Sequence, residues 1–198
     1  MPALTSKQWS TAKALVFVLC LLPLAYIVYA ALSQSLGADP VKALIQLSGE
    51  WGIRFFILTM AISPLRAWLA WGWALRFRRM LGLYTYFYVS FHLLIVTTYL
   101  FAWDWTIVQE ELAERRYIIV GFAAWLFMLP LAITSNNRAV RALRKNWGRL
   151  HMLVYPALFL AWLHIAWQVR SSYFDAALYA IVIIVLFSQR FQRLKNTL

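Results

Sequence analysis

The chain has 198 residues, of which 63% are hydrophobic and only 13% are charged, and its formal net charge is +12. The mean hydropathy is +0.66, and a soluble domain of this size needs more polar surface than this composition supplies. These values exclude an ordinary soluble domain. They predict a single all-α domain, residues 1–198, folded as a polytopic membrane helical bundle.

Six hydrophobic stretches approach the length of about 20 residues that crosses a bilayer as a helix. The predicted spans are approximately residues 12–33, 49–65, 80–103, 117–137, 149–168 and 173–189. The first could instead be a signal peptide, but its charge-free run exceeds the roughly 7–15 apolar residues of a signal h-region. The second is the weakest, because Arg54 and Arg66 bound a short apolar run. Residues 33–48, with Gly37 and Pro40 as breakers, are expected to form a loop.

The basic residues alternate between loops, and this pattern predicts the orientation. With six spans both termini share one side, and that side carries 14 of the 19 Lys and Arg residues. All seven acidic residues, Glu50 included, are assigned to the other side. The positive-inside rule makes the basic side, with both termini, cytoplasmic in a bacterial inner membrane. The positive charge thus reflects topology and gives no reason to expect a nucleic-acid partner.

Three histidines, His92, His151 and His164, lie within the predicted spans. An ionisable residue inside a membrane span is by default a functional candidate. The alternative is a neutral histidine that hydrogen-bonds to a neighbouring helix. The three imidazoles are the only groups in the predicted spans that titrate near neutral pH, which favours the functional interpretation.

Depth separates the three histidines. At about 1.5 Å per residue, His92 lies about 18 Å beyond Met80, and His164 about 24 Å beyond Gly148. His151 lies only about 5 Å beyond Gly148. If two histidines bind one metal, the predicted pair is His92 and His164, and His151 belongs to a separate site near the cytoplasmic face. On an ideal helix His151 and His164 also differ by about 140° in direction, so they cannot easily share a ligand.

Small and polar residues near the pair have two interpretations each. Ala157 and Ala161 lie on the His164 face, where they either leave room for a flat macrocycle or allow close helix packing. Thr85, Tyr88 and Tyr99 share roughly one face with His92, either as part of the membrane core or as the wall of a cofactor site. The sequence leaves both choices open.

Haem is the cofactor that two histidines suit best. Zinc usually takes four protein ligands, often including Cys or carboxylate, and the one cysteine, Cys20, is interpreted as a core thiol. A porphyrin supplies four nitrogens, so two axial histidines complete the iron site. A proton relay would need buried acids beside the histidines. Low-spin haem with two axial histidines suits electron transfer.

Four sequence stretches carry a resemblance to a known family. They are ISPLR, RRMLGLYTYFYVSFH, ITSNNRAVRALRKNWGRLHMLVY and LAWLH. Together they resemble the MsrQ (YedZ) family, the haem-binding membrane subunits of bacterial periplasmic methionine sulfoxide reductase systems. That family is part of the ferric reductase-like transmembrane superfamily. The resemblance extends from about Ala14 to Lys195.

The resemblance implies cofactors and partners. It implies b-type haem with His92 and His164 as axial ligands, and a second, cytoplasmic-side haem or flavin site at His151. FMN is implied as well, with no residue assigned to it. The expected partners are a periplasmic molybdopterin methionine sulfoxide reductase (MsrP-like) as acceptor and a quinone or a cytosolic flavin reductase as donor. No G-x-G-x-x-G sequence occurs in the chain, so NAD(P)H oxidation is expected on another protein.

Two other functions remain open from the sequence. One is a stand-alone haem-containing quinone or ferric reductase. The other is a cofactor-free membrane scaffold or small transporter, in which the histidines are replaceable. The favoured prediction is an electron-transfer subunit whose substrate catalysis takes place on a partner protein.

Overall fold

The computed structural model describes residues 5–168 and 173–195, and these residues form helices joined by short turns and loops, with no strand among them. The elements are α1 (Ser6–Leu32), α2 (Pro40–Trp68), η1 (Gly72–Arg76), α3 (Arg78–Tyr99), α4 (Trp105–Glu114), α5 (Arg116–Ile133), α6 (Asn137–Leu143), α7 (Lys145–Leu150), η2 (His151–Leu153), α8 (Val154–Gln168) and α9 (Phe174–Lys195). The predicted all-α class is confirmed.

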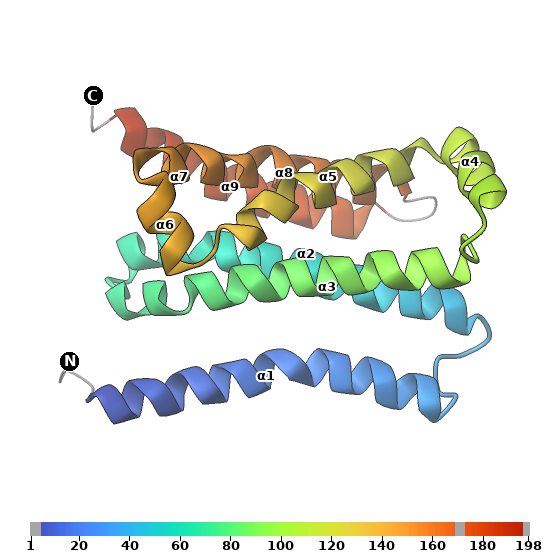
Figure 1. The fold of residues 1–198 in the computed structure, drawn as a ribbon, viewed down its shortest axis with the longest axis horizontal. Coiled ribbons are helices and arrows are strands. Elements are labelled where there is room, and N and C mark those ends of the chain that lie inside the picture. The colour runs from blue at the N-terminus through green and yellow to red at the C-terminus, as the bar shows by residue number, and fades with distance from the viewer. Residues whose placement is uncertain (1–4, 169–172, 196–198) are drawn as a thin grey trace.

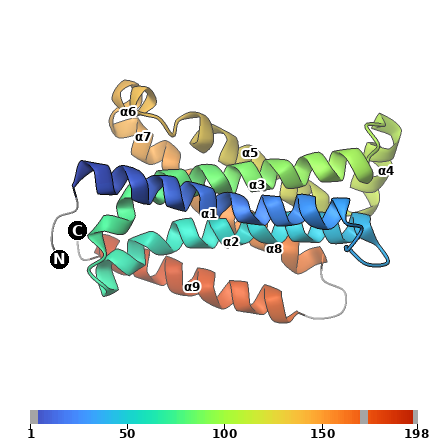
Figure 2. The same cartoon turned by 90° about the horizontal axis from the view of Figure 1, so that it is seen from below.

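The long helices run side by side in three tiers. Figure 1 shows α1 along one side, α2 and α3 in the middle, and α5, α8 and α9 on the far side. The start of α1 and the end of α9 lie at the same end of the bundle as α6 and α7, whereas α4 lies at the opposite end (Figures 1 and 2). The long helices therefore alternate in direction along the chain.

Several helices have the length and composition of membrane spans. Four described segments meet both conditions: Ser6–Leu32, Arg78–Tyr99, Arg116–Ile133 and Lys145–Gln168. Phe174–Ser188 is a shorter apolar helix. Large apolar side chains, such as Phe17, Leu19 and Leu22 of α1, are at least half exposed. An apolar surface of this extent suits lipid rather than water.

Helix α2, whose span has the weakest sequence signal, is shared by both hydrophobic cores. On one side Phe55 and Ile62 pack with residues of α1, η1 and α3, among them Cys20 and Tyr88. On the other side Ile53, Phe56 and Met60 pack with residues of α5, α8 and α9. Cys20 is buried and free, as expected for a core thiol. The position of α2 thus determines how the two halves of the bundle meet.

The loop predicted for residues 33–48 is wrong beyond residue 39. Asp39 caps α2 by accepting a hydrogen bond from the Lys42 amide at 3.0 Å, and Pro40 occupies the first helical position. An Asp N-cap followed by proline favours the start of a helix, because proline has no amide hydrogen to leave unpaired there. Pro40 therefore begins the helix rather than breaking it.

Tyr88 attaches α1 to α3. Its hydroxyl is fully buried, donates to the Cys20 carbonyl at 2.8 Å and accepts from the Leu24 amide at 3.0 Å. These two backbone groups would pair with each other in an uninterrupted helix. The insertion lies beside Pro23 in α1, and it links two helices that otherwise meet mainly through apolar side chains.

We expect Tyr88→Phe to destabilise the protein by about 1–2 kcal/mol, because two buried hydrogen bonds to α1 are lost and only partly replaced. Thermal unfolding of the purified protein in detergent measures the effect. Tyr99→Phe is the matched control, because Tyr99 is 55% exposed on the same helix. Equal melting temperatures for the two variants would contradict the role assigned to Tyr88.

Candidate functional site

Two histidines that are far apart in the sequence meet in the middle of the bundle. His92 of α3 and His164 of α8 have ring centroids 6.4 Å apart, with an angle of 76° between the ring planes. Both side chains are partly buried. Because α3 and α8 belong to different tiers of the bundle, the pair lies between its two halves.

The His92 ring is held by α2. Its Nδ1 lies 3.0 Å from the Ile45 carbonyl oxygen and 3.1 Å from the Ser48 hydroxyl. A carbonyl oxygen only accepts, so Nδ1 carries the hydrogen, and Nε2 keeps its lone pair. Ser48 is fully buried and itself donates to the Leu44 and Ile45 carbonyls. Gly49 faces the ring, since a Cβ there would lie 3.2 Å from His92 Cε1.

The His164 ring is held by α5 in the same way. Its Nδ1 donates to the Tyr117 carbonyl oxygen at 2.7 Å. Gly121 lies against the ring, and a Cβ there would be only 2.6 Å from His164 Nδ1. Each histidine therefore follows its carbonyl acceptor by 47 residues, and each acceptor is followed four positions later by the glycine that makes room for the ring.

This arrangement suits two imidazoles that bind one metal through Nε2. Metal-binding histidines usually donate the other ring N–H to a carbonyl or carboxylate, which sets the tautomer and the ring direction. An imidazole nitrogen lies about 1 Å from its ring centre and about 2 Å from the metal, so two rings on one metal have centroids about 6 Å apart. The separation of 6.4 Å agrees with this value. An edge-to-face ring pair would also allow that separation, but it does not require both Nδ1–H groups to be tied to carbonyls.

Haem fits this donor set better than a metal held by protein ligands alone. Among the described residues, no three or more His, Cys, Asp or Glu side chains gather closely enough to hold a metal ion. A porphyrin needs only two axial ligands from the protein. His92 and His164 therefore have the number, tautomer and spacing that an axial pair requires, and their role as ligands stays a prediction.

His151 lies apart from this pair, at the end of the bundle that carries α6 and α7. Its Nε2 is 3.1 Å from the Thr134 hydroxyl, and its ring stacks on Trp147 with centroids 3.8 Å apart. The side chains of Arg78 and Arg79, at the start of α3, interact electrostatically with the His151 ring. The 3₁₀ turn at His151–Leu153 separates it from α8. Thr134 and Trp147 were not anticipated from the sequence.

The small and polar residues near the pair have packing roles. Ala157 is fully buried, and it packs with Phe56 and Met60 of α2, while Ala161 lies against the same core. The hydroxyl oxygens of Thr85 and Thr59 of α2 lie 3.3 Å apart. The Tyr88 hydroxyl donates to the Cys20 carbonyl of α1. The structure thus favours helix packing over a cofactor wall for these residues.

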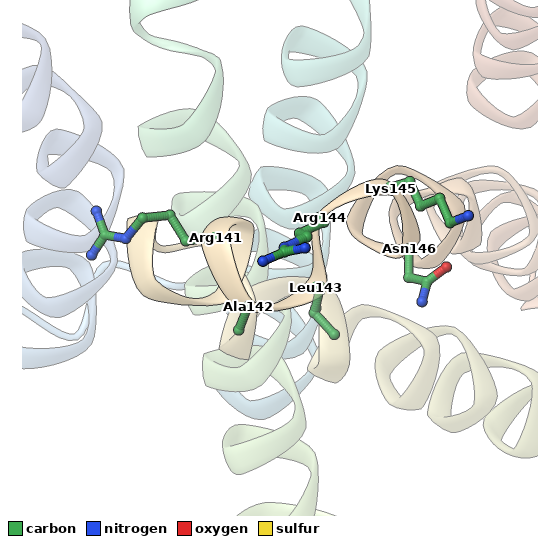
Figure 3. A pocket seen from close by; sticks show the side chains of 6 residues that line it. All are labelled: Arg141, Ala142, Leu143, Arg144, Lys145 and Asn146. Atoms are coloured by element: carbon green, nitrogen blue, oxygen red, sulfur yellow. The ribbon is translucent and has the colours of Figure 1, made fainter.

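The basic loop forms a hollow on the surface at the same end as His151. Figure 3 shows its lining, Arg141 to Asn146, with the Arg141, Arg144 and Lys145 side chains spread around it. Its volume is about 610 Å³. Arg144 has a φ of 48°, in the left-handed region, where α6 ends and α7 begins. The segment is positively charged, as the sequence predicts, but it forms the short helices α6 and α7 rather than a loop.

Comparison with known proteins gives a consistent result. Residues 16–162 match the family model described as Ferric reductase like transmembrane component. The "Protein-methionine-sulfoxide reductase heme-binding subunit MsrQ" of Xanthomonas oryzae pv. oryzae (strain MAFF 311018) is 45% identical over 194 residues, which cover 95% of this chain and 89% of that protein. The proteins of the same name from Xanthomonas campestris pv. campestris (strain B100) and Polaromonas naphthalenivorans (strain CJ2) are 48% and 40% identical, over 80% and 90% of this chain and 72% and 83% of their own lengths.

The fold and these matches define a helical membrane protein of the ferric reductase-like transmembrane class. Within that class, the chain belongs to the MsrQ family.

Proposed function

We propose that this protein is a membrane electron-transfer subunit that holds a b-type haem between His92 and His164. The observation that carries the proposal is the ring separation of 6.4 Å, with each Nδ1 tied to a backbone carbonyl. His92 and His164 would hold the haem, which would supply one-electron iron chemistry when bound. The relatives' name, heme-binding subunit, supports the same cofactor.

The chain's own residues orient the cofactor and separate it from water. Ile45 and Tyr117 fix the direction of the two imidazoles through their carbonyl oxygens. Apolar cores lie on both sides of α2, and apolar surroundings of this kind limit the access of water to the site. A rigid, dry site lowers the rearrangement needed when the charge of the cofactor changes.

The topology and partners follow from this function. We propose six spans in a bacterial inner membrane, with both termini cytoplasmic, because α6 and α7 gather basic residues at one end and α4 carries acids at the other. Electrons enter at the His151 end from a quinone or a cytosolic flavin reductase. They leave toward a periplasmic molybdopterin methionine sulfoxide reductase (MsrP-like), in keeping with the relatives' name. His151 serves a second haem or an FMN.

Transfer of electrons across a sealed membrane tests the proposal. The purified protein, reconstituted in vesicles that enclose ferricyanide, should reduce it with dithionite supplied outside, and vesicles without protein should not. The reduced-minus-oxidised spectrum should be that of haem b. His151→Ala should keep the haem of the His92–His164 pair and lose only the second cofactor. A colourless protein would favour a scaffold. Undiminished quinone or ferric-chelate reduction in cells that lack the periplasmic partner would favour a stand-alone reductase, because ferricyanide in the vesicle assay serves only as an artificial electron acceptor.

A further inference from the structure

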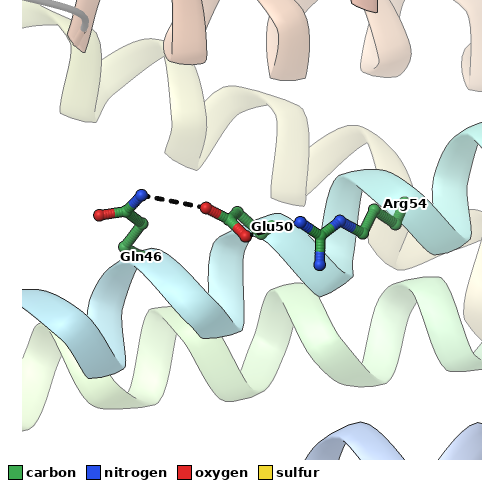
Figure 4. Close-up of polar contacts among 3 residues, drawn as sticks. All are labelled: Gln46, Glu50 and Arg54. Atoms are coloured by element: carbon green, nitrogen blue, oxygen red, sulfur yellow. Dashed lines mark hydrogen bonds and ion pairs between the residues drawn. The ribbon is translucent and has the colours of Figure 1, made fainter. Parts of the chain in front are cut away.

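Helix α2 carries an ion pair where the sequence predicts none. Glu50 accepts from the Arg54 guanidinium at 2.8 Å and from the Gln46 side-chain amide at 3.0 Å (Figure 4). The charge pattern predicts Glu50 on the outer side with the other acids. Because α2 begins at Pro40, Glu50 lies about 15 Å along the helix. The ion pair therefore lies in the interior of α2, a helix that the six-span proposal places across the membrane.

The ion pair lies at the depth of the paired histidines. Ser48 bonds to His92, and Gly49 faces the His92 ring. Glu50 is the next residue along the helix, so its backbone is about 1.5 Å deeper than that of Gly49. Arg54 starts one turn further on, and its guanidinium reaches back to the Glu50 carboxylate. Both charges thus belong to the level of α2 that supports His92.

The two charges are fixed in direction. Gly52 faces Val89 of α3, and Phe55 stacks on Tyr88, whereas Glu50 and Arg54 project from α2 away from the α3 ribbon (Figure 4). The guanidinium also lies 5.1 Å from the Trp51 ring centroid. The carboxylate therefore has two donors, and the guanidinium has an acceptor and an aromatic ring. Their side chains are 29% and 46% exposed in the absence of lipid and cofactor.

Stability does not account for this pair. An exposed ion pair four residues apart on a helix contributes little to stability, while charges within a membrane span are costly to bury. Such residues in spans usually serve a function. The proposed haem would change its charge by one unit on each oxidation or reduction. Its proposed ligand His92 contacts Ile45 and Ser48 of α2.

We propose that the charges of Glu50 and Arg54 set the midpoint potential of the haem that His92 and His164 would hold. This inference rests on the proposed function. Ferric haem carries one more positive charge than ferrous haem, so the Glu50 carboxylate stabilises the oxidised form and the Arg54 guanidinium stabilises the reduced form. In a low-dielectric interior these interactions are screened much less than in water. Charge and burial near a haem are recognised means of tuning its potential.

Redox titration of the purified haem-loaded protein, followed by its optical spectrum, tests the inference. We expect Glu50→Gln to raise the midpoint potential and Arg54→Gln to lower it, with haem content and ligand spectrum unchanged in both. The double variant should lie between the two. Glu111→Gln is the matched control, because Glu111 of α4 and Arg115, the residue that follows α4, form the same kind of pair, 3.0 Å apart and four residues apart, at the opposite end of the bundle from α6 and α7. That control should titrate like the wild type.

The outcomes separate this inference from the proposed function. Full haem with unchanged potentials in both single variants would overturn the role of the pair and leave the function standing. Shifts in the same direction would also overturn it, because they would indicate distortion rather than charge. If Glu50→Gln fails to accumulate, the downward shift in Arg54→Gln decides the matter alone. A wild-type protein without haem would overturn the proposed function, and this inference with it.

Discussion

His92→Ala and His164→Ala are each expected to lower the occupancy of the haem held by the His92–His164 pair by more than about tenfold in the purified protein. Each variant removes one of two axial ligands, and even loss of a residue that only supports a metal ligand typically costs about 10–100-fold in affinity. The pyridine haemochrome assay and the optical spectrum measure the loss. The physical reason is that the two ring centroids lie 6.4 Å apart, whereas the third histidine, His151, contacts Thr134 instead.

His151→Ala is the matched control for these two variants. It also removes an imidazole, but one whose ring contacts Thr134 and Trp147, so it should keep the haem of the His92–His164 pair and lose only the second cofactor. Elution of all three variants as single species by size exclusion would show that they fold. Full haem content in either His92→Ala or His164→Ala would contradict the pairing.

Gly121→Ala is expected to reduce haem affinity by about 10–100-fold without lowering the stability of the haem-free protein. The new Cβ would lie 2.6 Å from His164 Nδ1. The ring must therefore move, and its bond to the Tyr117 carbonyl must lengthen or break. Alanine in place of glycine favours a helix by about 1 kcal/mol, which roughly offsets the lost hydrogen bond, so the haem-free variant should melt near the wild-type temperature. Haem titration and thermal unfolding measure the two effects separately.

Two other glycines calibrate this result. Gly82→Ala adds a Cβ that meets only Thr59, at 3.6 Å, which is ordinary contact. It should keep full haem affinity. Gly49→Ala should have a smaller effect than Gly121→Ala, since its Cβ would be 3.2 Å from His92 Cε1. Wild-type haem affinity in Gly121→Ala would show that the His164 ring does not occupy the position described here.

Much of the bundle follows from patterns along the chain. The apolar runs predict where the long helices lie, because a helix in lipid needs an unbroken hydrophobic length. Those patterns underestimate the length of α2. Glu50 and Arg54 interrupt its apolar run, and Pro40 is easily mistaken for a helix breaker. Its Asp39–Pro40 start is a local signal that the sequence contained.

Part of the support for the histidines was also present in the sequence. In each half of the chain a residue is followed after four positions by glycine and after 47 by histidine: Ile45, Gly49 and His92, then Tyr117, Gly121 and His164. Composition and hydropathy do not single out this repeated spacing. Its role depends on the contacts of the two carbonyls with the two rings, which only the folded chain makes.

The helical membrane class and the depth match of His92 with His164 rather than His151 follow from the chain alone. Both depend on quantities that add up along one chain, namely hydrophobic length and rise per residue. The packing of the helices, by contrast, sets which backbone carbonyls orient the rings, why Gly49 and Gly121 must lack a side chain, and that Glu50 comes one residue after the glycine that faces His92. These depend on the rotation and close approach of neighbouring helices, which side-chain packing sets and one-dimensional patterns do not record.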